Sequence, residues 1–130
     1  MTRREIREQI FQILFGVEFH TVEELNEQME LALDRENMKA EDYSYITEKL
    51  IDICQKTQQI DAAINATAKG WKTSRMGKVD LTLIRLAVYE IRYEESIPTK
   101  VSINEAVELA KKYGNDGTPA FVNGVLAKFA

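Results

Sequence analysis

The stretch VSINEAVELAKKYGNDGTPAFVNGVLAKFA, residues 101–130, is typical of two consecutive helices. Ser102 and Glu105 have the S-x-x-E spacing of a capping box, in which each side chain binds the other residue's free backbone N–H. A second helix is predicted to begin at Thr118, because Pro119 then lies in the first turn, where a missing N–H costs nothing. The stretch therefore predicts a helix, a short turn and a second helix.

Apolar residues in this stretch recur at the spacing of one helical face. They are Ile103, Ala106, Val107 and Ala110 in the first helix, and Phe121, Val122, Val125, Leu126 and Phe129 in the second. Lys111 and Lys112 fall in the last turn of the first helix, where the dipole favours cations. Gly114 is predicted to end that helix in the left-handed conformation.

The rest of the chain follows the same period. Further helices are predicted from Thr2 to about Glu18, from Thr21, over roughly 41–56, from Ile60 to about Ala68, and from a cap at Asp80. Thr2 with Glu5, and Thr21 with Glu24, have the T-x-x-E spacing of a capping box. The predicted inward residues are Val22, Leu25, Met29 and Ala32 in the helix from Thr21, and Leu83, Ile84, Ala87, Val88 and Ile91 in the helix from Asp80. No segment alternates with a period of two, so a sheet is not expected. The predicted fold class is all-helical, with about seven helices in one compact domain or in two small bundles packed together.

Composition restricts the class of protein. At 130 residues the chain is long enough for one domain with its own core. Its single cysteine, Cys54, cannot form an intramolecular disulfide or a cysteine-based metal site. No apolar run approaches the ~20 residues of a membrane span, and the first residues lack the apolar stretch of a signal peptide. A cytoplasmic protein with no membrane partner is expected.

Charge is distributed unevenly along the chain. The net charge is −4, which taken alone argues against a nucleic-acid partner. Residues 21–42, however, carry eight acids against two bases, whereas residues 69–112 carry nine bases against six acids. A basic surface away from the acidic segment therefore remains open.

Motifs that would indicate an enzyme are missing from the sequence. His20 is the only histidine and is interpreted as a helix-boundary residue, and Cys54 as a small core residue. No spacing matches H-E-x-x-H, a phosphate-binding loop or a dinucleotide fingerprint. We therefore predict no catalytic residue, no cofactor site and no metal site.

The first helix carries an apolar face and a second stripe beside it. The apolar face consists of Ile6, Ile10, Ile13, Leu14 and Val17. Arg4, Arg7, Phe11 and Phe15 share the adjoining stripe. One interpretation is that the two phenylalanines widen the core and the arginines pair with acids nearby. The other is a site for single-stranded RNA, in which arginines hold phosphates and exposed rings stack on bases.

Arg3 and Arg4 are unusual for their position. They fall in the first helical turn, where the dipole repels each cation by ~0.3–1 kcal/mol and acids would be more stable. A function other than helix stability is therefore expected for these two positive charges.

Three segments of the C-terminal half match a known family: WKTSRMGKVDLTLIRLAVYEI, IPTKVSINEAVELAKKYG and FVNGVLAKF. They resemble the bacterial NusB family of transcription antitermination factors. The segment RREIREQIFQILF near the start is similar to a thinned form of that family's arginine-rich first helix. Residues 21–60 match only in their helical pattern.

The resemblance implies a fold and a function. The fold would be one domain over residues 1–130, with two perpendicular helical bundles at 1–58 and 59–130. The function would be a non-catalytic adaptor in the transcription of ribosomal RNA operons. Its partners would be boxA RNA, the ribosomal protein NusE, other antitermination factors and RNA polymerase.

The resemblance also assigns roles to residues. Arg4 and Arg7 match arginines of the family's RNA-binding helix, and Phe15 matches an aromatic position near it. Arg3 and Phe11 are added to this RNA-binding surface from the charge of the first turn and the pattern of the stripe. Phe121 would lie beside the RNA, and the helix N-terminus after Gly117 would offer an anion site with no side chain in front of it. Asn123 and Gly124 also match the family segment beside the RNA, but they have a structural interpretation too, with Asn123 as a buried hydrogen-bond partner and Gly124 at a close helix crossing. Four other matching residues are interpreted mainly as scaffold: Trp71, Asp80, Arg85 and Tyr89.

Two departures from the family pattern bear on affinity. The first helix has only three arginines, and Ala120 stands where some relatives carry a polar or basic residue. RNA affinity without a partner is therefore expected to be weak. Two alternatives remain open: a detached module related to the front domain of ribosomal RNA cytosine methyltransferases, and a structural homodimer that covers the phenylalanine stripe.

Overall fold

A computed structural model describes residues 1–17 and 21–130 of the chain. Within these residues the regular structure is entirely helical, which confirms the predicted fold class. The elements are α1 (Arg3–Val17), α2 (Val22–Ala32), α3 (Ala40–Gln55), α4 (Thr57–Thr67), the short 3-10 turn η1 (Thr73–Arg75), α5 (Lys78–Tyr93), α6 (Thr99–Tyr113) and α7 (Thr118–Ala127). The predicted end of the first helix at Glu18 and the boundary residue His20 lie outside the described residues.

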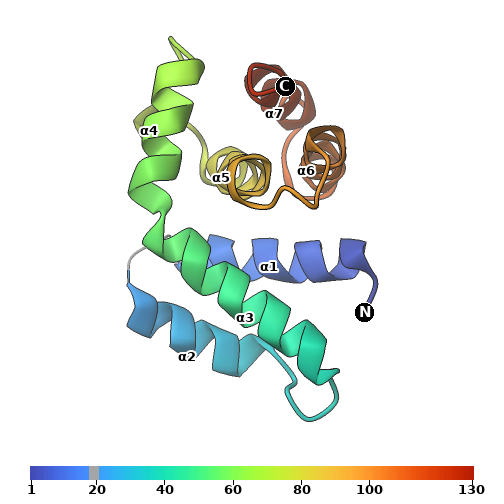
Figure 1. Ribbon diagram of the computed structural model, residues 1–130. Helices are drawn as coiled ribbons and strands as arrows, with labels where there is room; N and C mark the ends of the chain where they lie inside the picture. The colour runs from blue at the N-terminus through green and yellow to red at the C-terminus, as the bar shows by residue number, and fades with distance from the viewer. Residues whose placement is uncertain (18–20) are drawn as a thin grey trace. The chain divides into compact units, whose positions relative to one another are not determined.

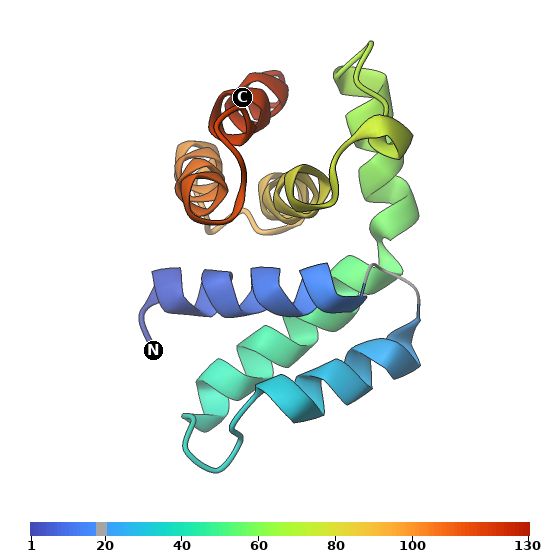
Figure 2. The same ribbon diagram turned by 180° about the vertical axis from the view of Figure 1, so that it is seen from behind.

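The chain divides into two compact units, residues 1–57 and residues 58–130. Helices α1, α2 and α3 belong to the first unit, shown in blue to green in Figure 1, and pack against one another. Helices α5, α6 and α7 form the packed body of the second unit, and their axes lie close to parallel in Figure 1 and Figure 2.

The first unit is built on the predicted apolar faces. Its buried residues include the whole predicted face of α1 together with Leu25, Met29, Ile46, Leu50 and Ile53. Thr21 caps α2 as predicted, because its hydroxyl accepts a hydrogen bond from the backbone N–H of Glu24 at 3.0 Å. The prediction that Val22 and Ala32 point inward is wrong, since both residues are exposed.

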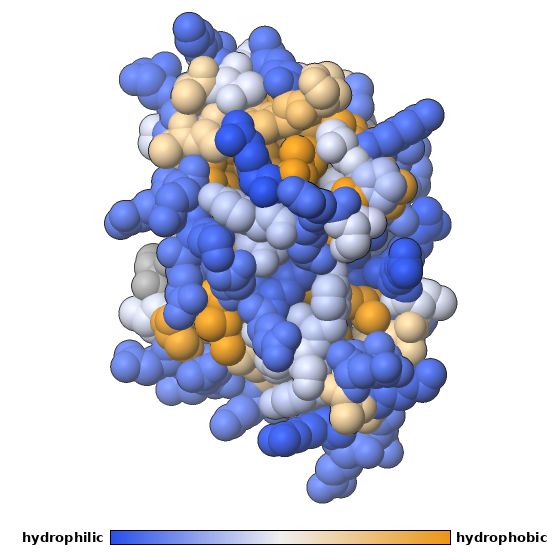
Figure 3. Space-filling model, viewed as in Figure 1, coloured by the Kyte–Doolittle hydropathy of each residue, from blue (hydrophilic) through white to orange (hydrophobic). Residues whose placement is uncertain are grey.

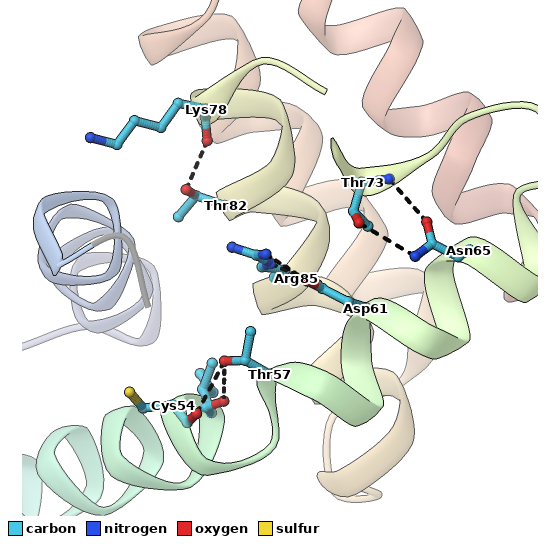
Figure 4. Close-up of polar contacts among 9 residues, drawn as sticks. Cys54, Thr57, Asp61, Asn65, Thr73, Lys78, Thr82 and Arg85 are labelled. Atoms are coloured by element: carbon cyan, nitrogen blue, oxygen red, sulfur yellow. Dashed lines mark hydrogen bonds and ion pairs between the residues drawn. The ribbon is translucent and has the colours of Figure 1, made fainter. Parts of the chain in front are cut away.

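The core of the second unit is centred on α5. Of the predicted inward residues, Leu83, Ile84, Ala87 and Val88 are buried, whereas Ile91 is only half-buried. Leu86 and Tyr89 are buried with them. The Arg85 guanidinium donates two hydrogen bonds to the Asp61 carboxylate, at 2.6 and 2.7 Å, which ties α5 to α4 (Figure 4). The paired geometry of this contact fits the predicted role of Arg85 as scaffold.

The start of α6 corrects one prediction. The helix begins at Thr99, after Pro98, so Ser102 lies inside the first turn and does not cap the helix. Ser102 is 1% exposed, and its hydroxyl donates to the carboxylate of the buried Glu90 on α5 at 2.8 Å. A buried carboxylate needs a hydrogen-bond donor more than an exposed helix end needs a cap, because water can satisfy the helix end.

Gly114 and Asp80 also differ from prediction. Gly114 has φ −94° and ψ −174°, so it does not end α6 in the left-handed conformation. Glycine is required there because a Cβ would lie 2.5 Å from the Cβ of Thr118. Asp80 does not cap α5, which begins at Lys78, and its carboxylate instead accepts a hydrogen bond from the Thr118 hydroxyl at 3.1 Å.

Candidate nucleic-acid interface

The N-terminus of α1 is organised by a reciprocal cap. The Thr2 backbone N–H donates to Glu5 Oε1 at 2.8 Å, and the Glu5 backbone N–H donates to Thr2 Oγ1 at 3.1 Å. These are the two bonds of a capping box, as the T-x-x-E spacing predicts. The N-terminal amine also lies 3.5 Å from Asp42 on α3, so the start of α1 is held within the first unit.

This cap affects the charge beside Arg3 and Arg4. The hydrogen bond from the Thr2 backbone N–H, and then that from its hydroxyl, hold the pKa of the Glu5 carboxyl below its usual value. The carboxylate therefore stays ionised and offsets the positive end of the helix dipole. Arg3 and Arg4 are both exposed in this first turn, where their guanidinium groups can reach a phosphate.

The other residues of the predicted stripe, Arg7, Phe11 and Phe15, are partly or fully buried. Arg7 is 9% exposed and Phe11 only 2%, while Phe15 is half-buried. The two rings lie 6.0 Å apart between centroids, with an angle of 40° between their planes. An exposed Phe11 ring that stacks on a base was therefore a wrong expectation: the stripe adjoins the apolar face of the helix, and burial of a large ring is strongly favourable.

At the start of α7, backbone N–H groups that could bind an anion already have hydrogen-bond partners within the turn. Gly117 is exposed and has an ordinary helical φ of −86°. Its backbone N–H donates to the Asn115 side chain at 3.0 Å, and the Thr118 N–H donates to the Asn115 carbonyl at 3.1 Å. Since Pro119 has no N–H, the first amides of α7 are largely satisfied within the turn. The resemblance, more than this geometry, supports a phosphate near Gly117.

Phe121 lies in an aromatic pair that the sequence did not reveal. Its ring is half-buried and meets the Trp71 ring edge to face, with 5.2 Å between centroids and 73° between the planes. Trp71 is 53% exposed although it was interpreted as scaffold. The available signal was composition, because the only tryptophan of the chain follows Lys69 and precedes Lys72.

Asn123 and Gly124 are surface residues, which corrects their interpretation as scaffold. Both are exposed, and a Cβ added at Gly124 would meet no heavy atom within 4 Å. No close helix crossing therefore requires this glycine. Gly124 follows Phe121 by three residues and lies on the same side of α7, whereas Asn123 follows it by two residues and points away from that side.

The candidate residues are thus distributed over both units. The first unit carries Arg3, Arg4, Arg7, Phe11 and Phe15, all on α1. The second unit carries Gly117 and Phe121, at the start of α7. Of these residues, Arg3, Arg4 and Gly117 are exposed, whereas Arg7 and Phe11 are buried.

In the ranges 1–17 and 21–130, no group of three or more His, Cys, Asp or Glu side chains could hold a metal ion. None of the described helices is long and apolar enough to cross a membrane. Cys54 is partly buried, and burial raises the pKa of its thiol, so its thiolate is disfavoured. Polar side chains cover most of the face seen in Figure 3.

Comparison with known proteins reveals similarity over the whole chain. The model of the NusB family matches residues 4–130. The chain is 61% identical over 131 residues to the transcription antitermination protein NusB of Agathobacter rectalis, and the match covers 100% of both sequences.

Solved structures show the same fold. The chain matches NusB of T. maritima with a TM-score of 0.90 and 35% identity, over 100% of this chain and 91% of that one. A chain in the crystal structure of antitermination factors NusB and NusE in complex with dsRNA matches with a TM-score of 0.80 and 24% identity, over 98% of this chain and 94% of that one. The family match over almost the whole sequence, together with these similarities, establishes that this chain belongs to the NusB family.

Proposed function

We propose that this protein is a transcription antitermination factor. It binds boxA RNA together with ribosomal protein NusE, and so promotes processive transcription of ribosomal RNA operons. The observation that carries this proposal is the family match over residues 4–130, with a relative of that name 61% identical along its full length.

The exposed start of α1 supports RNA as a ligand. Arg3 and Arg4 project from a capped helix end, and an arginine guanidinium can bind a phosphate through two parallel hydrogen bonds. Arg7 is a different case, because it is 9% exposed and an alanine there would also remove buried contacts. Arg3 and Arg4 are therefore the cleaner positions at which to test phosphate binding.

A protein partner strengthens this RNA site. Two exposed arginines on a chain with a net charge of −4 give limited affinity for a polyanion. NusE beside the site would supply further cationic contacts, and the coupling between RNA and NusE must then be reciprocal.

We place NusE on α5 and α6. Tyr93 at the end of α5 is 41% exposed and Val101 near the start of α6 is 42% exposed, so both present apolar surface. Interface cores are enriched in aromatic residues such as tyrosine. Val101→Asp should therefore weaken NusE binding without moving the RNA affinity measured in the absence of NusE.

The proposed role is that of an adaptor and includes no catalytic step. The protein would act in the cytoplasm, where RNA polymerase transcribes the ribosomal operons. Antitermination is tested by transcription through a terminator downstream of boxA, with RNA polymerase, NusE and the other antitermination factors present. Addition of this protein should raise read-through on the boxA template and leave a template with a scrambled boxA unchanged. Equal read-through on both templates would refute the proposal.

A further inference from the structure

The segment that joins α4 to α5 combines an exposed ring with positive charge. Trp71 is 53% exposed and is the only tryptophan of the chain. Lys69, Lys72 and Arg75 lie within four residues of it and are exposed, as is Lys78, and residues 69–78 contain no acid. The nearest acid along the chain, Asp80, accepts a hydrogen bond from the Thr118 hydroxyl.

Hydrogen bonds hold this segment in a defined conformation. Gly70 takes φ +91°, and the Trp71 N–H donates to the Ala68 carbonyl at 3.0 Å. The Thr73 N–H donates to the Asn65 side chain at 2.9 Å, and this contact fixes η1 beside α4 (Figure 2, Figure 4). A ligand that binds here therefore meets an ordered turn and does not have to order it.

The ring itself is also positioned. Its edge-to-face contact with Phe121, 5.2 Å between centroids, anchors Trp71 to the start of α7 while half of the residue stays in solvent. A tryptophan gains more from burial than most side chains, so an anchored ring with half its surface exposed is suited to contact a ligand.

We propose that Trp71, with Lys69, Lys72 and Arg75 close to it along the chain, is a second point at which single-stranded RNA binds, next to Phe121. The indole stacks on an unpaired base, and the three cations contact the phosphates on either side of it. RNA is favoured over a protein partner because three exposed cations lie within four residues of Trp71 and residues 69–78 contain no acid. This inference rests on the proposed RNA-binding function and extends its site.

The single tryptophan makes a direct test possible. Stacking should quench the intrinsic fluorescence of the wild-type protein when a short single-stranded boxA RNA is added. Loss of one stacked base lowers affinity by roughly five- to hundredfold. Trp71→Ala should therefore weaken binding of the same RNA, labelled and followed by fluorescence anisotropy, within this range, whereas Trp71→Phe keeps a ring and should retain most of the affinity. Circular dichroism melts confirm that each variant is folded.

A charge test keeps the proposal open to refutation if Trp71→Ala does not fold. Lys72→Gln should lower the slope of log affinity against log salt by about 0.7, the contribution of one phosphate contact on a single strand. Lys100→Gln is the matched control, since it is exposed in the first turn of α6, near the far end of α5, which is about 24 Å long. Its slope should stay at the wild-type value.

The outcomes separate the two proposals. If wild-type protein does not bind boxA RNA with or without NusE, the proposed function fails. If wild type and Trp71→Ala bind the RNA equally and the fluorescence does not change, only the present inference is overturned. If Trp71→Ala weakens NusE binding alone, the ring belongs to a protein interface and the inference is likewise overturned.

Discussion

Gly114 and Gly124 both lie in the C-terminal segment 101–130. Substitution of alanine at the two positions should nevertheless change the free energy of unfolding in opposite directions. Gly124 is exposed inside α7, and an added Cβ meets no atom within 4 Å. Alanine should stabilise this helix by about 0.8–1 kcal/mol, the difference between the two residues in a helix interior. For a chain of this size the gain corresponds to a rise in Tm of roughly 3–5 °C.

Gly114 offers no such space. A Cβ there would lie 2.5 Å from the Thr118 Cβ, and Thr118 is 2% exposed. Its hydroxyl bonds Asp80 at 3.1 Å and accepts from the Asn115 N–H at 3.2 Å, so Thr118 cannot move without breaking these bonds. Overpacking and one or two lost hydrogen bonds together should cost about 2–4 kcal/mol.

Thermal melts followed by circular dichroism, with urea unfolding as a second method, measure both changes. Gly117→Ala is a suitable third variant, since φ is −86° and the nearest contact of an added Cβ is 3.6 Å from Asn115. It should melt close to wild type. The reasoning is refuted if Gly114→Ala melts with the wild type or if Gly124→Ala melts below it.

Further predictions concern the RNA surface and the cap of α1. Arg3→Gln combined with Arg4→Gln should lower the slope of log boxA affinity against log salt by about 1.4, at about 0.7 per phosphate contact. Lys39→Gln, at an exposed control position, should leave this slope unchanged. An unchanged slope in the double variant would show that these arginines do not contact the RNA. Gly117→Asp should bind RNA more weakly than Gly117→Asn, with a gap that shrinks as salt rises, and equal affinities at low salt would exclude a phosphate near this residue. The Glu5 carboxyl should titrate by NMR below the usual 4.5, because its pKa is lowered by hydrogen bonds from Thr2. Its stabilising effect should then be present at neutral pH and lost as pH falls through that lowered value, so a normal midpoint would contradict the observed cap.

The helices could be predicted from sequence because their signals are local. The period of apolar residues placed the seven α-helices of the described residues, and the caps at Thr2 and Thr21 involve only four residues each. These signals depend on residues within one or two helical turns of each other. They could therefore be recognised without knowledge of tertiary contacts.

The errors arose where a residue's role depends on a distant part of the chain. Ser102 has the spacing of a cap, but the buried Glu90 on another helix binds its hydroxyl. Gly114 is required by the methyl and hydroxyl of Thr118, which a local reading of helix ends does not consider. Phe11 and Gly124 show the same limit, because periodicity defines the faces of a helix but not how far the neighbouring helices cover them.

Only part of the candidate site could be predicted from the sequence. The two arginines of the first turn were identified by their unfavourable position relative to the dipole, and both are exposed. Trp71 was passed over because a tryptophan is more often core than surface, and only its contact with Phe121 and its exposure reveal it.

Binding of boxA RNA with and without NusE tests the central claim most directly. Labelled boxA RNA and a scrambled RNA of equal length are titrated with this protein and followed by fluorescence anisotropy, first alone and then with saturating NusE. The proposed function predicts that NusE raises affinity for boxA, that RNA tightens the protein pair by the same factor, and that the scrambled RNA gains little. Equal affinity for both RNAs, unaffected by NusE, would contradict the proposed function.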